Sequence, residues 1–303
     1  MGSRYRLKIT MNMKPLAALC LLIGALAPLS APAGDLTFSL PTALSADAAA
    51  APKLQLHGRD ARWQLQVSQR LPASAAEASS AIPTSRDVTR QVAFSVQPAS
   101  IATVDASGFV TPLSNGSGTI VAQLDDEHQV SLAIEVSHMD TAQPVHFGNQ
   151  VVPIFTKFGC NGGGCHGKAS GQAGFKLSLL GFEPQEDYAH LVTESRGRRV
   201  FPALPEQSLL LQKATNQTPH GGGSRIEVDS HEYRLLQRWI ANGLNYGDPQ
   251  QAHVTSIEVV PQQSQLERGA TQQLSAIAVY SDGTIEDITR TVQYESNNTD
   301  LAD

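Results

Sequence analysis

Apolar and polar residues alternate in short runs between Leu54 and Val136. A period of two places every second side chain on the same face of a β-strand. The clearest runs carry apolar side chains at Trp63, Leu65 and Val67, at Val92, Phe94 and Val96, and at Val130, Leu132, Ile134 and Val136. Turn-forming residues separate them at Ser107-Gly108 and Asn115-Gly116-Ser117-Gly118. This pattern predicts an all-β antiparallel sandwich over residues 54–138.

Part of this pattern recurs at the end of the chain. Asp87-Val88-Thr89-Arg90 returns, 200 residues later, as Asp287-Ile288-Thr289-Arg290. The match continues without a gap through Val92 and Val292, Phe94 and Tyr294, Ile101 and Leu301, and Ala102 and Ala302. A repeat that keeps its apolar positions over this length indicates a second copy of one module, at residues 254–303.

The second copy is shorter than the first. It has no equivalents of the strands expected at Ile120–Leu124 and Val130–Val136. We therefore expect a truncated sandwich whose apolar faces and strand edges are uncovered. On this view residues 254–303 are mobile and protease-sensitive, and the natural product is longer.

Between the two modules the apolar residues follow a helical period. Val151, Ile154, Phe155 and Phe158 share one face, as do Tyr233, Leu236 and Ile240, with Leu235 and Trp239 beside them. Pro205 is placed to open a helix, Asp229 to cap the last one, and Asn242-Gly243 to end it. These signals predict a small, mainly α domain inserted between two β-modules.

The first 33 residues have the form of a secretory signal peptide. Four basic residues precede an apolar stretch from Leu16 to Leu26, and Ala31-Pro32-Ala33 supplies small residues for cleavage before Gly34. Residues 34–53, rich in Ala, Ser and Pro, are expected to be a linker. We therefore predict an exported protein of the periplasm or cell surface, without a membrane span in the mature chain.

Processing changes the charge and the cysteine count. The full chain has a formal charge of −6; losing four basic residues leaves 18 Lys and Arg against 28 Asp and Glu, a charge of −10. Such an acidic protein has no electrostatic basis for binding nucleic acid. Only Cys160 and Cys165 remain, and outside the cytosol two cysteines ordinarily form a disulfide.

Both cysteines belong to the segment Cys160-Asn-Gly-Gly-Gly-Cys165-His166. Two thiols followed directly by a histidine are the groups that attach a haem covalently and ligate its iron, usually with two residues between the cysteines. Here four residues separate them, and the three glycines can fold the longer loop compactly at positive φ. A Cys160–Cys165 disulfide and a zinc site are the alternatives, although zinc would need a fourth ligand.

Two family resemblances follow from longer motifs. Residues 146–247 resemble the cytochrome c-like domain of planctomycete-type multidomain surface proteins, in which the four-residue spacing recurs. The flanking modules resemble the group 2 bacterial immunoglobulin-like domain, through Asp87-Val-Thr-Arg90, Ile101-Ala-Thr-Val-Asp105 and Gly116-Ser-Gly-Thr-Ile-Val-Ala122. The cytochrome motifs are, in order, Phe158-Gly-Cys-Asn-Gly-Gly-Gly-Cys-His-Gly167, Gly174-Phe-Lys-Leu-Ser-Leu-Leu-Gly-Phe182, Gly197-Arg-Arg-Val200, Pro205-Glu-Gln-Ser-Leu-Leu-Leu211, Pro219-His-Gly-Gly-Gly223 and Trp239-Ile-Ala-Asn-Gly243.

The cytochrome resemblance implies a haem c attached at Cys160 and Cys165, with its iron bound by His166. No methionine follows Met139, so we expect His220, which lies where related cytochromes place a methionine, to be the second axial ligand. His190 and His231 are the substitutes. Arg198 and Arg199 are either partners of the haem propionates or a solvated pair.

The function expected from these features is one-electron transfer, with a redox partner protein or further domains of a longer chain as the partner. Two other functions fit the same features. One is a surface adhesion or structural protein with a disulfide and no haem. The other is a haem peroxidase-like enzyme with an open iron position.

Overall fold

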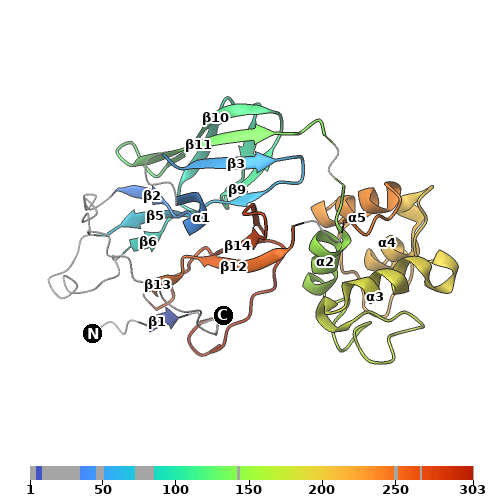
Figure 1. Ribbon diagram of the computed structural model, residues 1–303. Helices are drawn as coiled ribbons and strands as arrows, with labels where there is room; N and C mark the ends of the chain where they lie inside the picture. The colour runs from blue at the N-terminus through green and yellow to red at the C-terminus, as the bar shows by residue number, and fades with distance from the viewer. Residues whose placement is uncertain are drawn as a thin grey trace, which may run out of the picture.

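The computed structural model describes residues 5–8, 35–45, 51–71, 85–141, 144–248, 252–266 and 268–302. Segments from both ends of the chain form a β-rich part, and the middle of the chain forms a helical part beside it (Figure 1). The predicted cleavage site lies outside the described residues. Of the predicted signal peptide, the structure describes only β1 (Tyr5–Lys8), which pairs with β13 (Gln263–Leu266).

A β-sandwich forms the first module, as the alternating pattern predicts. It is not wholly antiparallel, because the strand Lys53–His57 runs parallel to its neighbour Gln129–Ser137. One sheet has the order β3-β11-β10-β7, and a second has the order β4-β9-β8. The first comprises β3 (Lys53–His57), β7 (Ala93–Gln97), β10 (Gly116–Gln123) and β11 (Gln129–Ser137). The second comprises β4 (Trp63–Gln64), β8 (Ala102–Val104) and β9 (Phe109–Pro112). Leu54, Ile120 and Ile134 from the first sheet share a core with Trp63 and Val110 from the second.

A third sheet includes part of the segment expected to be a linker, residues 34–53. Within it, β2 (Leu36–Phe38) pairs with β5 (Val67–Arg70), which in turn pairs with β6 (Ser85–Asp87). A short helix, α1 (Thr42–Ser45), follows β2. Leu36 is buried against Val67 in a small core, so this segment belongs to the first module.

The second module repeats this third sheet with the same register. Its strands are β12 (Val254–Val260), β14 (Ser275–Tyr280) and β15 (Ile285–Asp287), in the order β12-β14-β15. In the first module Phe38 pairs with Val67 and Ser68 with Asp87; in the second, Val259 pairs with Ala276 and Ile277 with Asp287. The repeat is thus confirmed, and it includes β2, which the sequence pattern missed.

The expectation that the apolar face of the second module is uncovered is wrong. Ile277 of β14 is fully buried in the core of the first module, and Ile285 of β15 packs against the same core. Because the first module covers this face, the reason for predicting mobility and protease sensitivity of residues 254–303 no longer holds.

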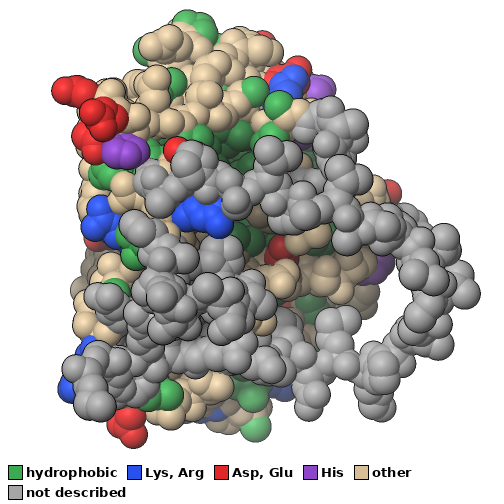
Figure 2. Space-filling view, turned by 90° about the vertical axis from the view of Figure 1, so that its left-hand side faces the viewer, with side chains coloured by type: hydrophobic (Ala, Val, Ile, Leu, Met, Phe, Trp, Pro, Cys, Tyr) green, Lys and Arg blue, Asp and Glu red, His purple; other side chains and the backbone are tan. Residues whose placement is uncertain are grey.

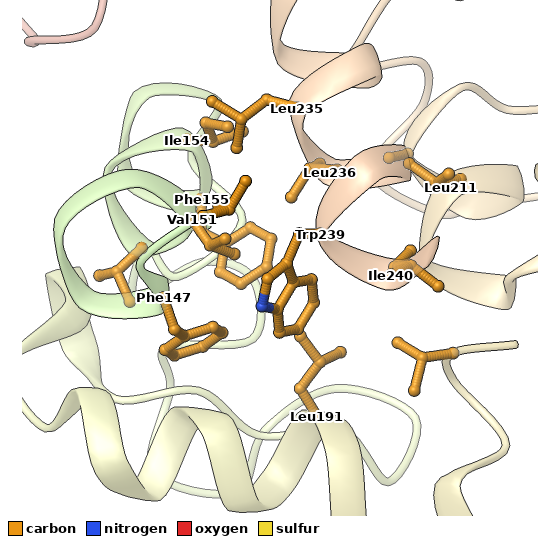
Figure 3. Packing of buried hydrophobic residues seen from close by; sticks show 14 of the residues in the cluster. Phe147, Val151, Ile154, Phe155, Leu191, Leu211, Leu235, Leu236, Trp239 and Ile240 are labelled. Atoms are coloured by element: carbon orange, nitrogen blue, oxygen red, sulfur yellow. The ribbon is translucent and has the colours of Figure 1, made fainter. Parts of the chain in front are cut away.

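Short helices and turns make up the middle of the chain. They are η1 (Phe147–Val151), α2 (Val152–Lys157), η2 (Leu179–Gly181), α3 (Pro184–Tyr188), η3 (Ala189–Thr193), η4 (Glu194–Gly197), η5 (Pro205–Gln207), α4 (Leu209–Ala214) and α5 (His231–Ala241). Figure 3 shows Trp239 of α5 among Phe147, Phe155 and Leu191. This packing fixes α2 against α5.

No helix of the described residues is long and apolar enough to cross a membrane.

Two details of the helix ends differ from the expectation. The N-cap of α5 is Ser230, whose hydroxyl accepts a hydrogen bond from the backbone N–H of Tyr233 at 3.1 Å; Asp229 is not the cap and has a φ of +61°. The helix expected after Pro205 is divided into η5 and α4, because Ser208 has an extended ψ of 130°. The helical domain is therefore built from shorter pieces than the periodicity indicates.

The surface of the β-rich part does not carry a concentrated basic region where it is visible in Figure 2. On the described residues of that face, Lys and Arg side chains are scattered among acidic, apolar and other ones. This agrees with the acidic composition.

Candidate functional site

The loop that carries both cysteines begins where α2 ends. Gly159 makes the turn with a φ of +70°, a conformation that favours glycine. The loop then closes on itself, since the N–H of His166 donates to the carbonyl of Cys160 at 3.0 Å and that of Gly167 to the carbonyl of Gly162 at 3.1 Å. The three glycines between the cysteines do not use the positive φ that glycine allows; in this loop only Gly159, before Cys160, does so.

His166 is held by the chain segment that follows the loop. Its Nδ1 lies 3.0 Å from the carbonyl oxygen of Phe175, and the ring centroids of these two residues are 4.7 Å apart. Burial lowers the pKa of His166, which favours the neutral imidazole. A carbonyl acceptor at Nδ1 requires the proton on that nitrogen, so the lone pair of Nε2 is available to a metal ion.

The ring of His220 lies near that of His166 and nearly parallel to it. The interplanar angle is 5° and the ring centroids are 6.2 Å apart. Nδ1 of His220 lies 3.0 Å from the carbonyl oxygen of Gly223. As in His166, this contact places the proton on Nδ1 and leaves the lone pair on Nε2. A first-row metal ion binds an imidazole nitrogen at about 2 Å, so two imidazoles on opposite sides of one ion have centroids about 6 Å apart. The observed centroid distance of 6.2 Å agrees with this value.

These residues line a cavity of about 600 Å³. This volume lies within the range of sites for small molecules and cofactors. Its wall is mostly apolar, with Phe155, Phe175, Leu177, Leu191, Leu209, Leu210, Ala214, Ile226 and Leu236. Cys160, Cys165 and His166 lie in one part of the wall, and His220 comes from the loop between α4 and α5. The cavity thus combines an apolar interior with two thiols and two imidazoles.

The cavity also has four basic side chains in its wall: Arg198, Arg199, Lys213 and Arg225. Sequence reasoning missed Lys213 and Arg225, because nothing in their local sequence connects them with the cysteine loop. The wall contains no Asp or Glu. A ligand with an apolar body and anionic groups matches this distribution of charge.

Arg199 is buried and donates hydrogen bonds to backbone carbonyls of its own domain, which does not agree with its expected role as a partner of the haem propionates. It is 4% exposed, and its guanidinium donates to the carbonyls of Gly174 and His190, both at 2.6 Å. The same group lies 4.7 Å from the centroid of the Phe175 ring. Because Phe175 in turn contacts His166, Arg199 supports the segment behind that histidine. Arg198 remains available at the cavity wall.

The two substitute histidines are not brought to His166. His190 lies outside the cavity wall and pairs with Glu194, with Nε2 3.5 Å from the carboxylate. His231 lies where the helical part meets the β-rich part, with Nδ1 3.5 Å from the guanidinium of Arg62. The structure therefore brings together His166 and His220 alone among the four candidates.

The two cysteines are free thiols in the structure. Among the described residues no group of three or more His, Cys, Asp and Glu side chains could hold a metal ion. A zinc site at Cys160, Cys165 and His166 therefore has no ligand set in the described part of the chain.

Cys160 in the protein without a ligand is expected to react slowly with iodoacetamide. Burial raises the pKa of its thiol to about 11, and the thiolate is the reactive form. In a Cys165→Ser protein, the rate of alkylation measured by mass spectrometry should rise about tenfold per pH unit from neutral pH to about pH 10. The Cys160→Ser protein, which reports Cys165, is the control. If the alkylation rate of Cys160 stops rising at a pH near the ordinary pKa of a cysteine, the raised pKa is wrong.

Comparison with known proteins identifies one part of the chain. Residues 253–303 match the family described as the bacterial Ig-like domain (group 2). This match confirms the resemblance stated for the second module. The first module is related to it because one sheet in each module has the same strand register. No curated protein matches the chain.

Proposed function

We propose that this chain is an exported c-type cytochrome module for electron transfer, held by immunoglobulin-like modules. Cys160 and Cys165 would attach the haem, and His166 and His220 would bind its iron on opposite sides. The observation that carries the proposal is the parallel pair of imidazoles with centroids 6.2 Å apart, in the wall of a cavity that also contains both thiols. A disulfide-closed loop would need neither His220 nor the cavity.

The residues of the cavity suit a haem in polarity and charge. Phe155, Leu191 and Leu236 offer apolar surface for the ring, and Arg198, Lys213 and Arg225 offer cations for its two carboxylates. The bound haem supplies one-electron redox chemistry. The carbonyls of Phe175 and Gly223 hold the two imidazoles in the tautomer that presents Nε2.

The pair of histidines favours electron transfer over catalysis. A peroxidase-like enzyme needs an open position on the iron, and ligation by both His166 and His220 would leave none. Histidine in place of methionine lowers the reduction potential. The expected partner is a redox protein or a further domain of a longer chain, in the periplasm or on the cell surface.

The test is the visible spectrum of the protein produced in the periplasm with a cytochrome c maturation system. We expect a low-spin haem spectrum without the far-red methionine–sulfur band, and haem that stays on the chain after denaturation. The Cys160→Ser/Cys165→Ser protein is the matched control and should lose the covalent haem. Wild-type protein without haem and with a Cys160–Cys165 disulfide would contradict the proposal and favour the structural protein.

A further inference from the structure

Helix α5 lies beside the β-rich part of the molecule, and charged side chains join the two (Figure 1). Arg238, in the last turn of α5, donates to the carboxylate of Asp60, which lies between β3 and β4. His231, the first residue of α5, has its Nδ1 3.5 Å from the guanidinium of Arg62. We call these four residues the α5 contact. It connects the helical domain to the first module.

The guanidinium of Arg62 is held in place by its own loop. Its Nη1 donates to the carbonyl of Arg59 at 2.8 Å and to that of Ala61 at 2.7 Å. Its Nη2 is the atom that meets His231. An arginine side chain stays protonated in proteins and has no acceptor atom. Arg62 therefore presents a fixed donor and a permanent positive charge to the histidine.

His231 can bond to Arg62 only as a neutral imidazole. Its Nδ1 must be the acceptor, which places the proton on Nε2. Protonation would make Nδ1 a second donor, so that two N–H groups and two positive charges would meet across this contact. His231 also lies in the first turn of α5, where the helix dipole disfavours a cation. The contact is thus made in one protonation state of the histidine.

The surroundings of His231 act in the same direction. Burial is the first cause that lowers its pKa, and the charge of Arg62 is the second. Arg234 of α5 lowers it as well, whereas the carboxylates of Asp60 and Glu232 oppose the shift. Since the pKa is lowered from the ordinary value of 6.5, the histidine in the α5 contact is neutral at neutral pH.

Both carboxylates near His231 already have a cationic partner. Asp60 pairs with Arg238, and Glu232 pairs with Lys157 of α2, whose Nζ lies 2.6 Å from its Oε1. A protonated His231 would compete with these cations for the same two carboxylates. A positive charge added at this position is therefore poorly compensated.

Glu286 of β15 is another titratable group that acts on the α5 contact. Burial raises the pKa of its carboxyl, and the nearby carboxylates of Asp287 and Asp60 raise it further. The hydroxyl of Tyr280 donates to it at 2.5 Å, which opposes the shift. Glu286 acts on Asp60, so a variant of His231 separates its effect from that of the histidine.

We propose that the α5 contact is a pH-sensitive switch, which releases the helical domain from the first module when His231 is protonated. A released helical domain contributes a histidine that binds protons more readily than the one in the contact. The contact is therefore fully stable above pH 6.5 and weakens as the pH falls below that value. Domains that meet through a polar contact move relative to each other once it is lost. The four residues lie outside the cavity wall, so the proposal does not depend on haem binding.

Small-angle X-ray scattering of the full chain at about pH 8 and about pH 5 tests the switch, since histidine titrates between these values. We expect the radius of gyration to increase on acidification, with a midpoint below pH 6.5. Circular dichroism at both pH values establishes that the domains remain folded. A radius of gyration that is the same at both pH values would overturn the proposal.

Two substitutions of His231 fix its charge. In His231→Asn an amide oxygen takes the place of Nδ1 and cannot be protonated, so the chain should stay compact at both pH values. His231→Lys places a permanent cation beside Arg62 and should be expanded at both. His128→Asn removes a histidine of the first module that pairs with Asp125, and this matched control should keep the wild-type response.

The same variants show which result would contradict the switch. If the His231→Asn chain still expands on acidification, the sensor is another group, such as Glu286, and the proposal is wrong. A His231→Lys chain that is folded and compact at about pH 8 would equally overturn it, because a cation at this position would then be tolerated in the contact.

Discussion

The haem-loaded His220→Ala protein is expected to have a high-spin ferric spectrum and to bind carbon monoxide after reduction. The wild-type protein should be low-spin and should not bind carbon monoxide, because the proposed ligation by both histidines would leave no open position on the iron. The expectation rests on the parallel rings of His166 and His220 and on the cavity that both line. Removing one ring opens one side of the site without touching the thiols.

His190→Ala is the matched control for this experiment. His190 is in the same domain but outside the cavity wall, so its removal should leave the low-spin spectrum unchanged. His166→Ala should abolish normal ligation, since that residue follows Cys165 directly. A His220→Ala protein that stays low-spin and inert to carbon monoxide would show that another residue is the second ligand.

The Gly167→Ala protein is expected to be strongly destabilised and to incorporate little haem. A Cβ at this position would lie 1.9 Å from the carbonyl oxygen of Asn161 and 2.6 Å from its carbonyl carbon. These are backbone atoms of a fully buried residue, so the loop itself must shift. We expect a loss of about 3 kcal/mol in the free energy of unfolding, at the upper end of overpacking effects. Chemical denaturation of the protein without haem measures it.

Gly164→Ala in the same loop is the control. Apart from its chain neighbours, no atom lies within 4 Å of a Cβ built there, so the substitution should change the unfolding free energy little. Equal loss in both variants would show that glycine content in general, rather than the close approach of Gly167 to Asn161, determines the stability of the loop.

The sequence predicts correctly those features that arise from neighbouring residues. Alternation at Trp63, Leu65 and Val67 indicates strands, and the helical spacing of Tyr233, Leu236 and Ile240 indicates the last helix. Cys160, Cys165 and His166 lie within seven consecutive residues, so the sequence alone shows that they share one loop. The repeat of Asp87-Val-Thr-Arg90 similarly indicates a second module, which the family match confirms.

The end of a helix is less well determined by local sequence. Both Asp229 and Ser230 are good N-cap residues, and the choice depends on which backbone conformation the preceding turn adopts. The structure selects Ser230, because Asp229 has a positive φ. A capping motif thus places the helix to within one residue but does not identify the cap.

By itself the sequence determined the types of element, the order of the modules and the loop with two thiols and a histidine. Only the tertiary structure decided that the rings of His166 and His220 lie near each other, that β2 joins the first module, and that Gln64 and Gln66 are buried. The physical reason is the same in each case. Periodicity records which face of an element is buried, whereas the partner that buries it comes from a distant part of the chain and is chosen by packing.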